Sequence, residues 1–344
     1  MEIYPFFRTL LFRLEPEQAH WLTLQLIRLV GGISPLRAVV RQQFKTRSEP
    51  VQAFGLSFKN PVGLAGGYDK DGLGWRGLAC LGFGHVEIGT VTPLAQAGNP
   101  KPRVFRLVED QALINRMGFP GRGAEFMARQ LSKPRSPGFI MGVNLGKNKD
   151  TPLEEAEKDY LELLQQFAGL GDYLAINVSS PNTVGLRRLQ ARDALEKLLA
   201  ALAQERGAIL SKQGMHKPVP VLVKLAPDLS SEELDDALGA ILDNQMDGVI
   251  ATNTTIQRQG LSSPLKEEMG GLSGLPLFMR SLEMVSETFR RTQGRLPIIG
   301  VGGITNVANA QAMLDAGATL VQIYTGLIYQ GPGLVKKILS GLHE

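Results

Sequence analysis

The stretch PIIGVGGIT, residues 297–305, contains the pattern that decides the fold, because a short apolar run ends in glycine and leads into a helical segment. Seven further apolar runs of this kind occur in the chain, and most end in glycine or polar residues. Continuous apolar runs without strict alternation indicate strands that are buried on both faces, as in a parallel sheet. The further predicted strands are 61–66, 85–91, 139–145, 173–178, 219–225, 247–252 and 319–324.

Helical segments are predicted between most of these strands, at about 152–168, 191–212, 230–243, 275–292, 305–316 and 332–341. Eight strand–helix units predict an α/β fold of the (β/α)₈ TIM-barrel class. An open, doubly wound sheet is the alternative, although no GxGxxG follows the first strand. Residues 92–138 are rich in Gly, Pro and Arg, and we expect them to form a long functional loop, such as a lid.

The net charge of +4 is concentrated at the N-terminus of the 344-residue chain. Residues 1–47 contain seven Arg and Lys against three Glu, six of the 22 aromatic residues, and only two of the 39 glycines. We therefore expect a basic, aromatic N-terminal domain at 1–47 and a neutral, glycine-rich barrel at 48–344. A barrel without net charge does not favour a nucleic-acid partner.

Two short helices are predicted in the N-terminal domain. Phe6 and Leu10 share one helical face, and a second helix begins at Pro16 and ends at Gly31-Gly32. Neither has the roughly 20 apolar residues that span a bilayer, and charged residues interrupt the apolar stretch that a signal peptide needs. Two interpretations stay open: a hairpin packed on the barrel, or a monotopic membrane contact through apolar faces flanked by arginines.

Cysteine and histidine are too scarce to build a metal site from those residue types. Cys80 is the one cysteine, and the four histidines His20, His85, His216 and His343 are scattered along the sequence. We expect no disulfide and no metal, and we expect Cys80 to be a buried core thiol.

Polar residues and glycines follow the predicted strands, where the catalytic residues of such barrels lie. Lys224 is placed inside an apolar strand, and a buried lysine requires a partner, so we expect it to be functional. The glycines at 302–303 and the YTG at 324–326 predict a phosphate site after the last two strands. The other strand-end residues are Asp69, Lys70, Thr90, Asn144, Lys147, Asn177, Ser179, Ser180, Asn182, Thr252, Asn253 and Thr254.

This set consists mainly of amides, hydroxyls and lysines, with Asp69 as the only acid. It disfavours glycosidase chemistry, which needs two facing carboxylates. It suits a planar ligand with imide and carboxylate groups, together with a phosphate-bearing redox cofactor such as FMN. Two alternatives are a Schiff-base aldolase or lyase that uses Lys224 or Lys70, and a non-catalytic barrel that senses a phosphate ligand.

Eleven strings follow one another over nearly the whole chain: GGYDKDG (66–72), EIGTVTP (87–93), GNPKPRVFRL (98–107), INRMGF (114–119), GVNLGKNKDTP (142–152), NVSSPNT (177–183), VKLAPD (223–228), ATNTT (251–255), GGLSG (270–274), GVGGI (300–304) and YTG (324–326). Together they resemble the class 2, membrane-associated dihydroorotate dehydrogenases of pyrimidine biosynthesis, and INRMGF and NVSSPNT are the most diagnostic. The resemblance implies an FMN-binding (β/α)₈ barrel preceded by a small two-helix domain.

The resemblance also implies the reaction, in which dihydroorotate is oxidised to orotate, a hydride passes from C6 to FMN, and a membrane quinone reoxidises the FMN. Ser180 would be the base that takes the C5 proton, helped by a water near Thr183 and Phe119. The implied substrate residues are Lys70, Asn115, Arg116, Met117, Gly118, Phe119, Asn177, Asn182, Asn253 and Thr254. The implied FMN residues are Gly66, Gly67, Lys70, Thr90, Asn144, Asn177, Lys224, Thr252, Gly274, Gly303, Tyr324 and Thr325.

The resemblance favours the membrane interpretation of the N-terminal domain, whose helices would form a hydrophobic tunnel for the quinone. His20 and Arg106 match positions near the quinone, and Lys224 would stabilise negative charge on the reduced flavin ring. We expect a peripheral protein on an anionic bilayer, at the cytoplasmic side of a bacterial cell membrane, because no long targeting presequence is present. The sequence departs from many relatives at Gly66 and Tyr68, where Ala and Leu are common.

Overall fold

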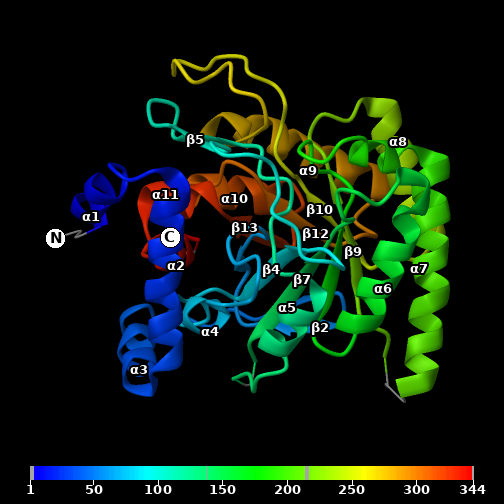
Figure 1. Ribbon diagram of the computed structural model, residues 1–344, viewed down its shortest axis with the longest axis horizontal. Helices are drawn as coiled ribbons and strands as arrows, with labels where there is room; N and C mark the ends of the chain where they lie inside the picture. Colours follow the sequence, from blue (N-terminus) through cyan, green and yellow to red (C-terminus); the bar gives the residue numbers. More distant parts are fainter. Residues whose placement is uncertain (1–3, 137, 214–216, 343–344) are drawn as a thin grey trace.

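The computed structural model describes residues 4–136, 138–213 and 217–342, so His216 and His343 lie outside the described residues. Eight parallel strands close a barrel in the order β10-β12-β13-β3-β4-β7-β8-β9 (Figure 1). The barrel prediction is confirmed and the open sheet is excluded, because every predicted run supplies one strand. The strands are β3 (Val62–Leu64), β4 (His85–Val91), β7 (Ile140–Leu145), β8 (Tyr173–Asn177), β9 (Val221–Leu225), β10 (Gly248–Ala251), β12 (Ile298–Val301) and β13 (Leu320–Ile323).

Helices cover the outside of the barrel, and each predicted helical segment contains one of them. Their apolar faces pack on the strands, which gives one continuous core around the barrel. The helices are α6 (Ala156–Phe167), α7 (Arg192–Gln213), α8 (Ser231–Asp243), α9 (Phe278–Thr292), α10 (Val307–Asp315) and α12 (Leu334–Gly341). Two shorter helices, α4 (Trp75–Leu78) and α11 (Thr325–Gln330), were not predicted, because they are too short to display a helical period.

A small hairpin of β1 (Val51–Ala53) and β2 (Leu56–Phe58) packs against the N-terminal ends of barrel strands. The Phe58 ring contacts His85 at the start of β4, with 5.3 Å between ring centroids. Phe54 contacts Tyr173 at the start of β8, with 6.4 Å between centroids. The aromatic residues of this hairpin therefore cover the N-terminal end of the barrel, and the C-terminal end is left for a site.

The predicted functional loop at 92–138 is not one continuous loop. The stretch contains a hairpin of β5 (Val104–Leu107) and β6 (Ala112–Asn115), and then α5 (Ala124–Leu131). β11 (Gly271–Gly274) pairs with β6 to complete a three-stranded antiparallel sheet. A four-residue strand between dense Gly and Pro residues is too short to be recognised from periodicity, and its pairing with β11 is not local.

The N-terminal segment forms three helices where the sequence predicted two: α1 (Tyr4–Leu11), α2 (Pro16–Gly32) and α3 (Ser34–Gln43). They lie together at one side of the barrel (Figure 1). α2 ends at Gly32 as predicted, and the additional helix α3 begins two residues later with Pro35 in its first turn. Glycine also permits close packing here, because a Cβ on Gly77 of α4 would lie 2.1 Å from the Ile27 carbonyl oxygen of α2.

Many large apolar side chains of these three helices point into solvent. Phe6 is 67% exposed, Trp21 is 63% exposed and Leu29 is 54% exposed. Within the described residues, no single helix has the length and hydropathy to cross a membrane. Taken together, α2 and α3 meet those two criteria, but they are bent by 109° relative to each other.

Candidate active site

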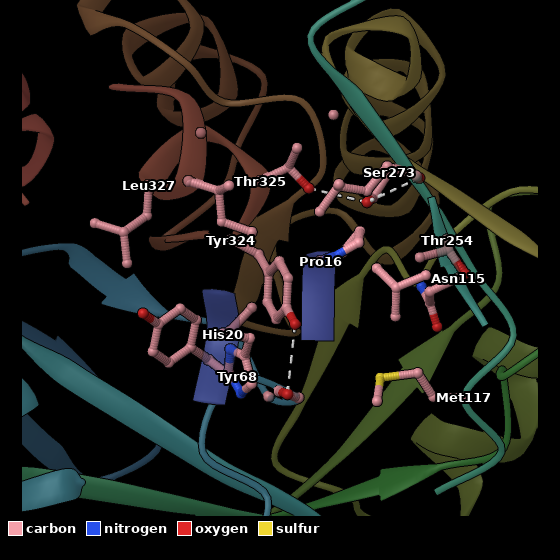
Figure 2. A pocket seen from close by; sticks show the side chains of 18 of the residues that line it. Pro16, His20, Tyr68, Asn115, Met117, Thr254, Ser273, Tyr324, Thr325 and Leu327 are labelled. Atoms are coloured by element: carbon pink, nitrogen blue, oxygen red, sulfur yellow. Dashed lines mark hydrogen bonds between the residues drawn. The ribbon is translucent and has the colours of Figure 1, made fainter. Parts of the chain in front are cut away.

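One cavity of about 460 Å³ runs from the C-terminal end of the barrel to the N-terminal helices. Figure 2 shows its lining from close by, with Tyr68, His20 and Tyr324 on one side and Asn115, Met117 and Thr254 on the other. All residues that the resemblance implies for the base, the substrate, FMN and the quinone line this cavity, with the exception of Arg116. The strand-end residues Asp69, Lys147 and Ser179, and also Thr183, do not line it. The lining set is His20, Gly66, Gly67, Lys70, Thr90, Arg106, Asn115, Met117, Gly118, Phe119, Asn144, Asn177, Ser180, Asn182, Lys224, Thr252, Asn253, Thr254, Gly274, Gly303, Tyr324 and Thr325.

Buried amides form one wall of the cavity at the ends of β7 and β8. The Asn177 amide donates to the Thr90 hydroxyl and to Asn144 Oδ1, both at 3.0 Å. Asn144 in turn donates to a Glu87 carboxylate oxygen at 2.8 Å. These bonds fix which edge of each amide faces the cavity, so the wall is organised before a ligand binds.

Lys224 has the partner that its burial requires. Its Nζ atom lies 3.6 Å from Glu87 Oε1, and both side chains are buried. Burial raises the pKa of Glu87, but Lys224 and the hydrogen bonds from Gln322 and Asn144 outweigh it, so the pKa lies below its ordinary value. Glu87 and Gln322 were not identified from the sequence, although a carboxylate and an amide inside the barrel strands β4 and β13 are a signal for such residues.

The turn after β3 positions a second lysine. The buried Asp69 carboxylate accepts the backbone N–H groups of Leu73 and Gly74, both at 2.8 Å, and so fixes the turn. Lys70 Nζ donates to the Gly67 carbonyl at 2.5 Å. Burial lowers the pKa of Lys70 to about 8, so it is mostly an ammonium at pH 7 and can pair with an anionic ligand.

The loops after β8 and β10 bring hydroxyls and amides to the other side of the cavity. Asn253 donates to Asn177 Oδ1 at 3.1 Å, and Asn182 donates to Asn115 Oδ1 at 3.2 Å. Ser180 Oγ accepts the backbone N–H of Asn182 at 3.3 Å and is nearly buried. Among the described residues the buried Thr254 hydroxyl has no hydrogen-bond partner, as expected of a group that binds a ligand.

Arg187 connects these loops through its guanidinium group. This residue was not identified from the sequence. It donates to the Ser179 carbonyl at 3.0 Å and to the Thr254 carbonyl at 2.8 Å. Its third contact is an ion pair with Asp228, at 2.7 Å. The guanidinium therefore fixes the loops after β8, β9 and β10 relative to one another. Two features of the sequence could have identified Arg187. It lies four residues after the NVSSPNT string (177–183), and the VKLAPD string ends in Asp228, an acid that can pair with it.

The turn after β12 has the properties of an anion site. Gly302 and Gly303 have φ of +131° and +71°, and a Cβ on Gly303 would lie 2.6 Å from backbone atoms of Phe278. Across the described chain, no hydrogen bond uses the N–H groups of Gly303 and Ile304. The Ser273 and Thr325 hydroxyls lie nearby, 2.9 Å apart (Figure 2). Because Asn306 caps α10 with its own side chain, the donors available to an anion are those of the turn.

The part of the cavity next to α1 and α2 is largely apolar and aromatic. The Tyr68 ring contacts both His20 and Tyr324, with centroid distances of 5.0 and 6.1 Å, and the three side chains lie on the same side of the cavity (Figure 2). Burial lowers the pKa of His20 to about 4, so the ring is neutral at pH 7. Arg106 donates to the Leu14 carbonyl at 2.8 Å. The cavity thus joins a polar compartment in the barrel to an apolar compartment beneath the N-terminal helices.

Arg116, which the resemblance places among the substrate residues, does not line the cavity. Its guanidinium pairs with Glu268 at 2.6 Å and lies 4.5 Å above the Phe105 ring. The side chains of an extended strand alternate between two faces, so Asn115 faces the cavity and Arg116 turns away. Cys80 is a buried free thiol, and the described residues contain no cluster of three metal-binding side chains.

The fold and the cavity define a (β/α)₈-barrel enzyme whose site lies at the C-terminal ends of the strands. The sequence model of one protein family, described as Dihydroorotate dehydrogenase, matches residues 50–344. Two bacterial proteins named Dihydroorotate dehydrogenase (quinone) are similar over 98% of this chain and 99% of their own length. The protein from Cronobacter sakazakii is 51% identical and that from Enterobacter sp. (strain 638) is 50% identical.

A solved structure of DHODH from Eimeria tenella in complex with ferulenol is 38% identical, covers 95% of this chain and 90% of its own, and has a TM-score of 0.85. The ligand-free form from the same organism has a TM-score of 0.83. The chain therefore belongs to the dihydroorotate dehydrogenase family, in the class whose bacterial relatives are named for quinone. It is an oxidoreductase.

Proposed function

We propose that this protein oxidises dihydroorotate to orotate with FMN bound in the barrel, and that a membrane quinone takes up the electrons. The observation that carries the proposal is the single cavity that joins a compartment of amides and lysines to an apolar compartment under exposed helices. A polar substrate and a lipid-soluble acceptor could therefore reach the same cofactor from different phases.

FMN fits the donors of this cavity. The backbone N–H groups of Gly303 and Ile304 and the hydroxyls of Thr325 and Ser273 suit its phosphate, while Lys224 and the amides suit its ring. FMN supplies a two-electron acceptor when it is bound. The residues proposed to hold it are Gly66, Gly67, Lys70, Thr90, Asn144, Asn177, Lys224, Thr252, Gly274, Gly303, Tyr324 and Thr325.

Substrate binding is assigned to Lys70 and to the amides around it. The Lys70 ammonium would pair with the carboxylate of dihydroorotate, and the side chains of Asn115, Asn182 and Asn253 can match the donors and acceptors of its imide edge. Ser180 would take the C5 proton, since its hydroxyl lines the same compartment. A serine needs a proton acceptor beside it, and the proposed water would lie near the buried Thr183 and Phe119.

The apolar compartment would receive the quinone, with Arg106 and the neutral His20 near its carbonyl groups. The exposed Phe6, Trp21 and Leu29 side chains, together with the surplus of arginines in this segment, suit an anionic bilayer surface. We therefore propose a peripheral protein on the cytoplasmic side of a bacterial cell membrane. The ion pair of Lys224 with Glu87 argues against a Schiff base at Lys224, which needs a neutral amine.

A visible spectrum of the purified protein tests this proposal. We expect a yellow protein whose flavin absorbance is lost when dihydroorotate is added without oxygen and returns when a quinone analogue is added. A colourless protein, or a yellow protein that dihydroorotate does not bleach, would refute the proposed reaction. If dihydroorotate bleaches the protein and a quinone does not restore the colour, only the acceptor is wrong.

A further inference from the structure

A fully buried carboxylate lies in the centre of the barrel, directly behind the cavity. Glu87 does not line the cavity, although Lys224, Asn144 and Gln322 beside it do. Its Oε1 atom lies 3.6 Å from Lys224 Nζ and accepts from Asn144 at 2.8 Å. Its Oε2 atom accepts from Gln322 at 3.0 Å and from Tyr173 at 3.2 Å. The carboxylate is thus surrounded by donors and is held in one position.

Burying a charge is unfavourable unless a partner compensates it, so the pair needs an explanation. A hydrophobic pair of similar volume often stabilises a protein core as well as an ion pair does. His85 at the base of the barrel supplies no further charge, because burial lowers its pKa to about 4. The carboxylate therefore balances one charge, the ammonium of Lys224, which is the member of the pair that reaches the cavity.

The backbone next to the pair leaves room for the carboxylate. A Cβ on Gly66 would lie 2.6 Å from Glu87 Oε1. Gly66 lines the cavity, so the space that its missing side chain leaves is taken by the carboxylate oxygen that faces Lys224. The position of Glu87 is thus fixed by hydrogen bonds at both oxygens and by the shape of the turn above it.

We propose that Glu87 is a positioning residue that acts through Lys224: it holds the ammonium in place beneath the cavity and sets how strongly that charge favours reduction of the bound FMN. The inference rests on the proposed function, because it assumes FMN in the cavity. Reduction adds electrons to the flavin, and a nearby positive charge favours it, whereas a carboxylate beside that charge offsets part of the effect. Removal of the carboxylate should therefore make FMN easier to reduce.

The test is the reduction potential of FMN in the full-length Glu87→Gln variant, measured by equilibration with dyes of known potential. We expect the equilibrium constant for two-electron reduction to rise at least about tenfold, which corresponds to roughly 30 mV. The KM for dihydroorotate should change less than roughly threefold, because Glu87 does not line the cavity. A potential equal to that of the wild type would overturn the inference.

Tyr173→Phe is the matched control, since it removes one hydrogen bond to the same carboxylate without changing any charge. A merely structural role predicts similar shifts in both variants and would overturn the inference, whereas the proposal predicts a shift only for Glu87→Gln. If Glu87→Gln does not retain FMN, Glu87→Asp provides the measurement, because it withdraws the negative charge from Lys224 and should shift the potential in the same direction. An unshifted Glu87→Asp would then overturn the inference. A wild type without flavin would refute the proposed function itself, and the inference with it.

Discussion

The C-terminal end of the barrel and the N-terminal helices depart in opposite ways from the usual burial of side chains. The C-terminal end of the barrel encloses charged side chains, and Lys224 is only 5% exposed, whereas the N-terminal helices leave Phe6 67% exposed. Proteins usually expose lysines and bury large aromatic residues. Each departure indicates what the region binds, because enclosed polar groups favour a polar ligand and exposed apolar groups favour an apolar phase.

One cavity joins the two regions, so each region can serve a different half of the proposed reaction. Lys70 and the amides belong to its polar compartment, and His20 and Arg106 belong to its apolar compartment. If the division is correct, a change in one region should impair one half of the reaction and spare the other.

Ser180→Ala should slow the reduction of bound FMN by dihydroorotate by about 10²- to 10⁴-fold, because a general base contributes that much. Stopped-flow absorbance without oxygen measures this step. FMN content should not change, and chemically reduced enzyme should be reoxidised by a quinone analogue at the wild-type rate. Reduction at a near-normal rate would exclude Ser180 as the base.

Replacing both Trp21 and Leu29 by glutamate should weaken binding to vesicles that contain anionic lipid by about 10²-fold or more. Burial of each side chain contributes about 1.5–3 kcal/mol, and the new charges repel anionic lipid. Cosedimentation measures the binding, and reduction of FMN by dihydroorotate should be unchanged. The control is Met279→Glu on α9, an equally exposed apolar residue of the barrel. Equal vesicle binding by both variants would contradict a bilayer contact through the N-terminal helices.

The KM for dihydroorotate should rise up to about tenfold per pH unit above pH 8, because Lys70 has a pKa of about 8 and loses its ammonium charge there. Steady-state kinetics between pH 7 and 9.5 measure the change. The lowered pKa of Lys70 also makes the free energy of unfolding depend on pH. The folded-state pKa is lower than that of the unfolded chain, so the contribution of Lys70 to stability increases as pH rises through 8 towards 10.5. A constant KM over this range would remove Lys70 from the carboxylate site.

Gly77→Ala should have the smallest effect on flavin reduction and a clear effect on stability. Its new Cβ would meet the Ile27 carbonyl oxygen at 2.1 Å, so α2 must move away from α4. Overpacking of this kind costs about 1–3 kcal/mol of unfolding free energy, which denaturant titration measures. Gly32→Ala is the matched control, because no atom lies within 4 Å of its added Cβ. Equal unfolding free energies of the two variants would show that α2 and α4 are not closely packed at Gly77.

Much of the fold could be predicted from local sequence. All eight barrel strands coincide with predicted apolar runs, because parallel strands buried on both faces need continuous apolar residues. The prediction failed for β5, β6 and β11, whose four-residue strands are stabilised by pairing between distant segments. It also missed α3: α2 ends at Gly32 as predicted, but a further helix begins at Ser34, only two residues later.

Almost all residues named by the family motifs line the cavity, since those motifs keep their order along the chain. Arg116 was the exception, because a motif names consecutive residues and does not say which of them face the cavity. Glu87, Gln322 and Arg187 were missed for the opposite reason. Glu87 and Arg187 do not line the cavity and act on residues that do, whereas Gln322 lines it and binds Glu87. The pairings of Glu87 with Lys224 and Asn144, and of Arg187 with Asp228, join distant positions in the chain.

The sequence by itself determined the barrel, the basic and aromatic N-terminal segment, and the residue types available for chemistry, because these depend on composition and on short-range periodicity. Only the tertiary structure decided that the polar and apolar compartments are one cavity, that Arg116 faces away from it, and that Glu87 pairs with Lys224 behind it. Those facts depend on the closure of the barrel, which brings strand ends and the N-terminal helices together from opposite ends of the chain. The Tyr4 hydroxyl, for example, donates to the Ile328 carbonyl, 324 residues away.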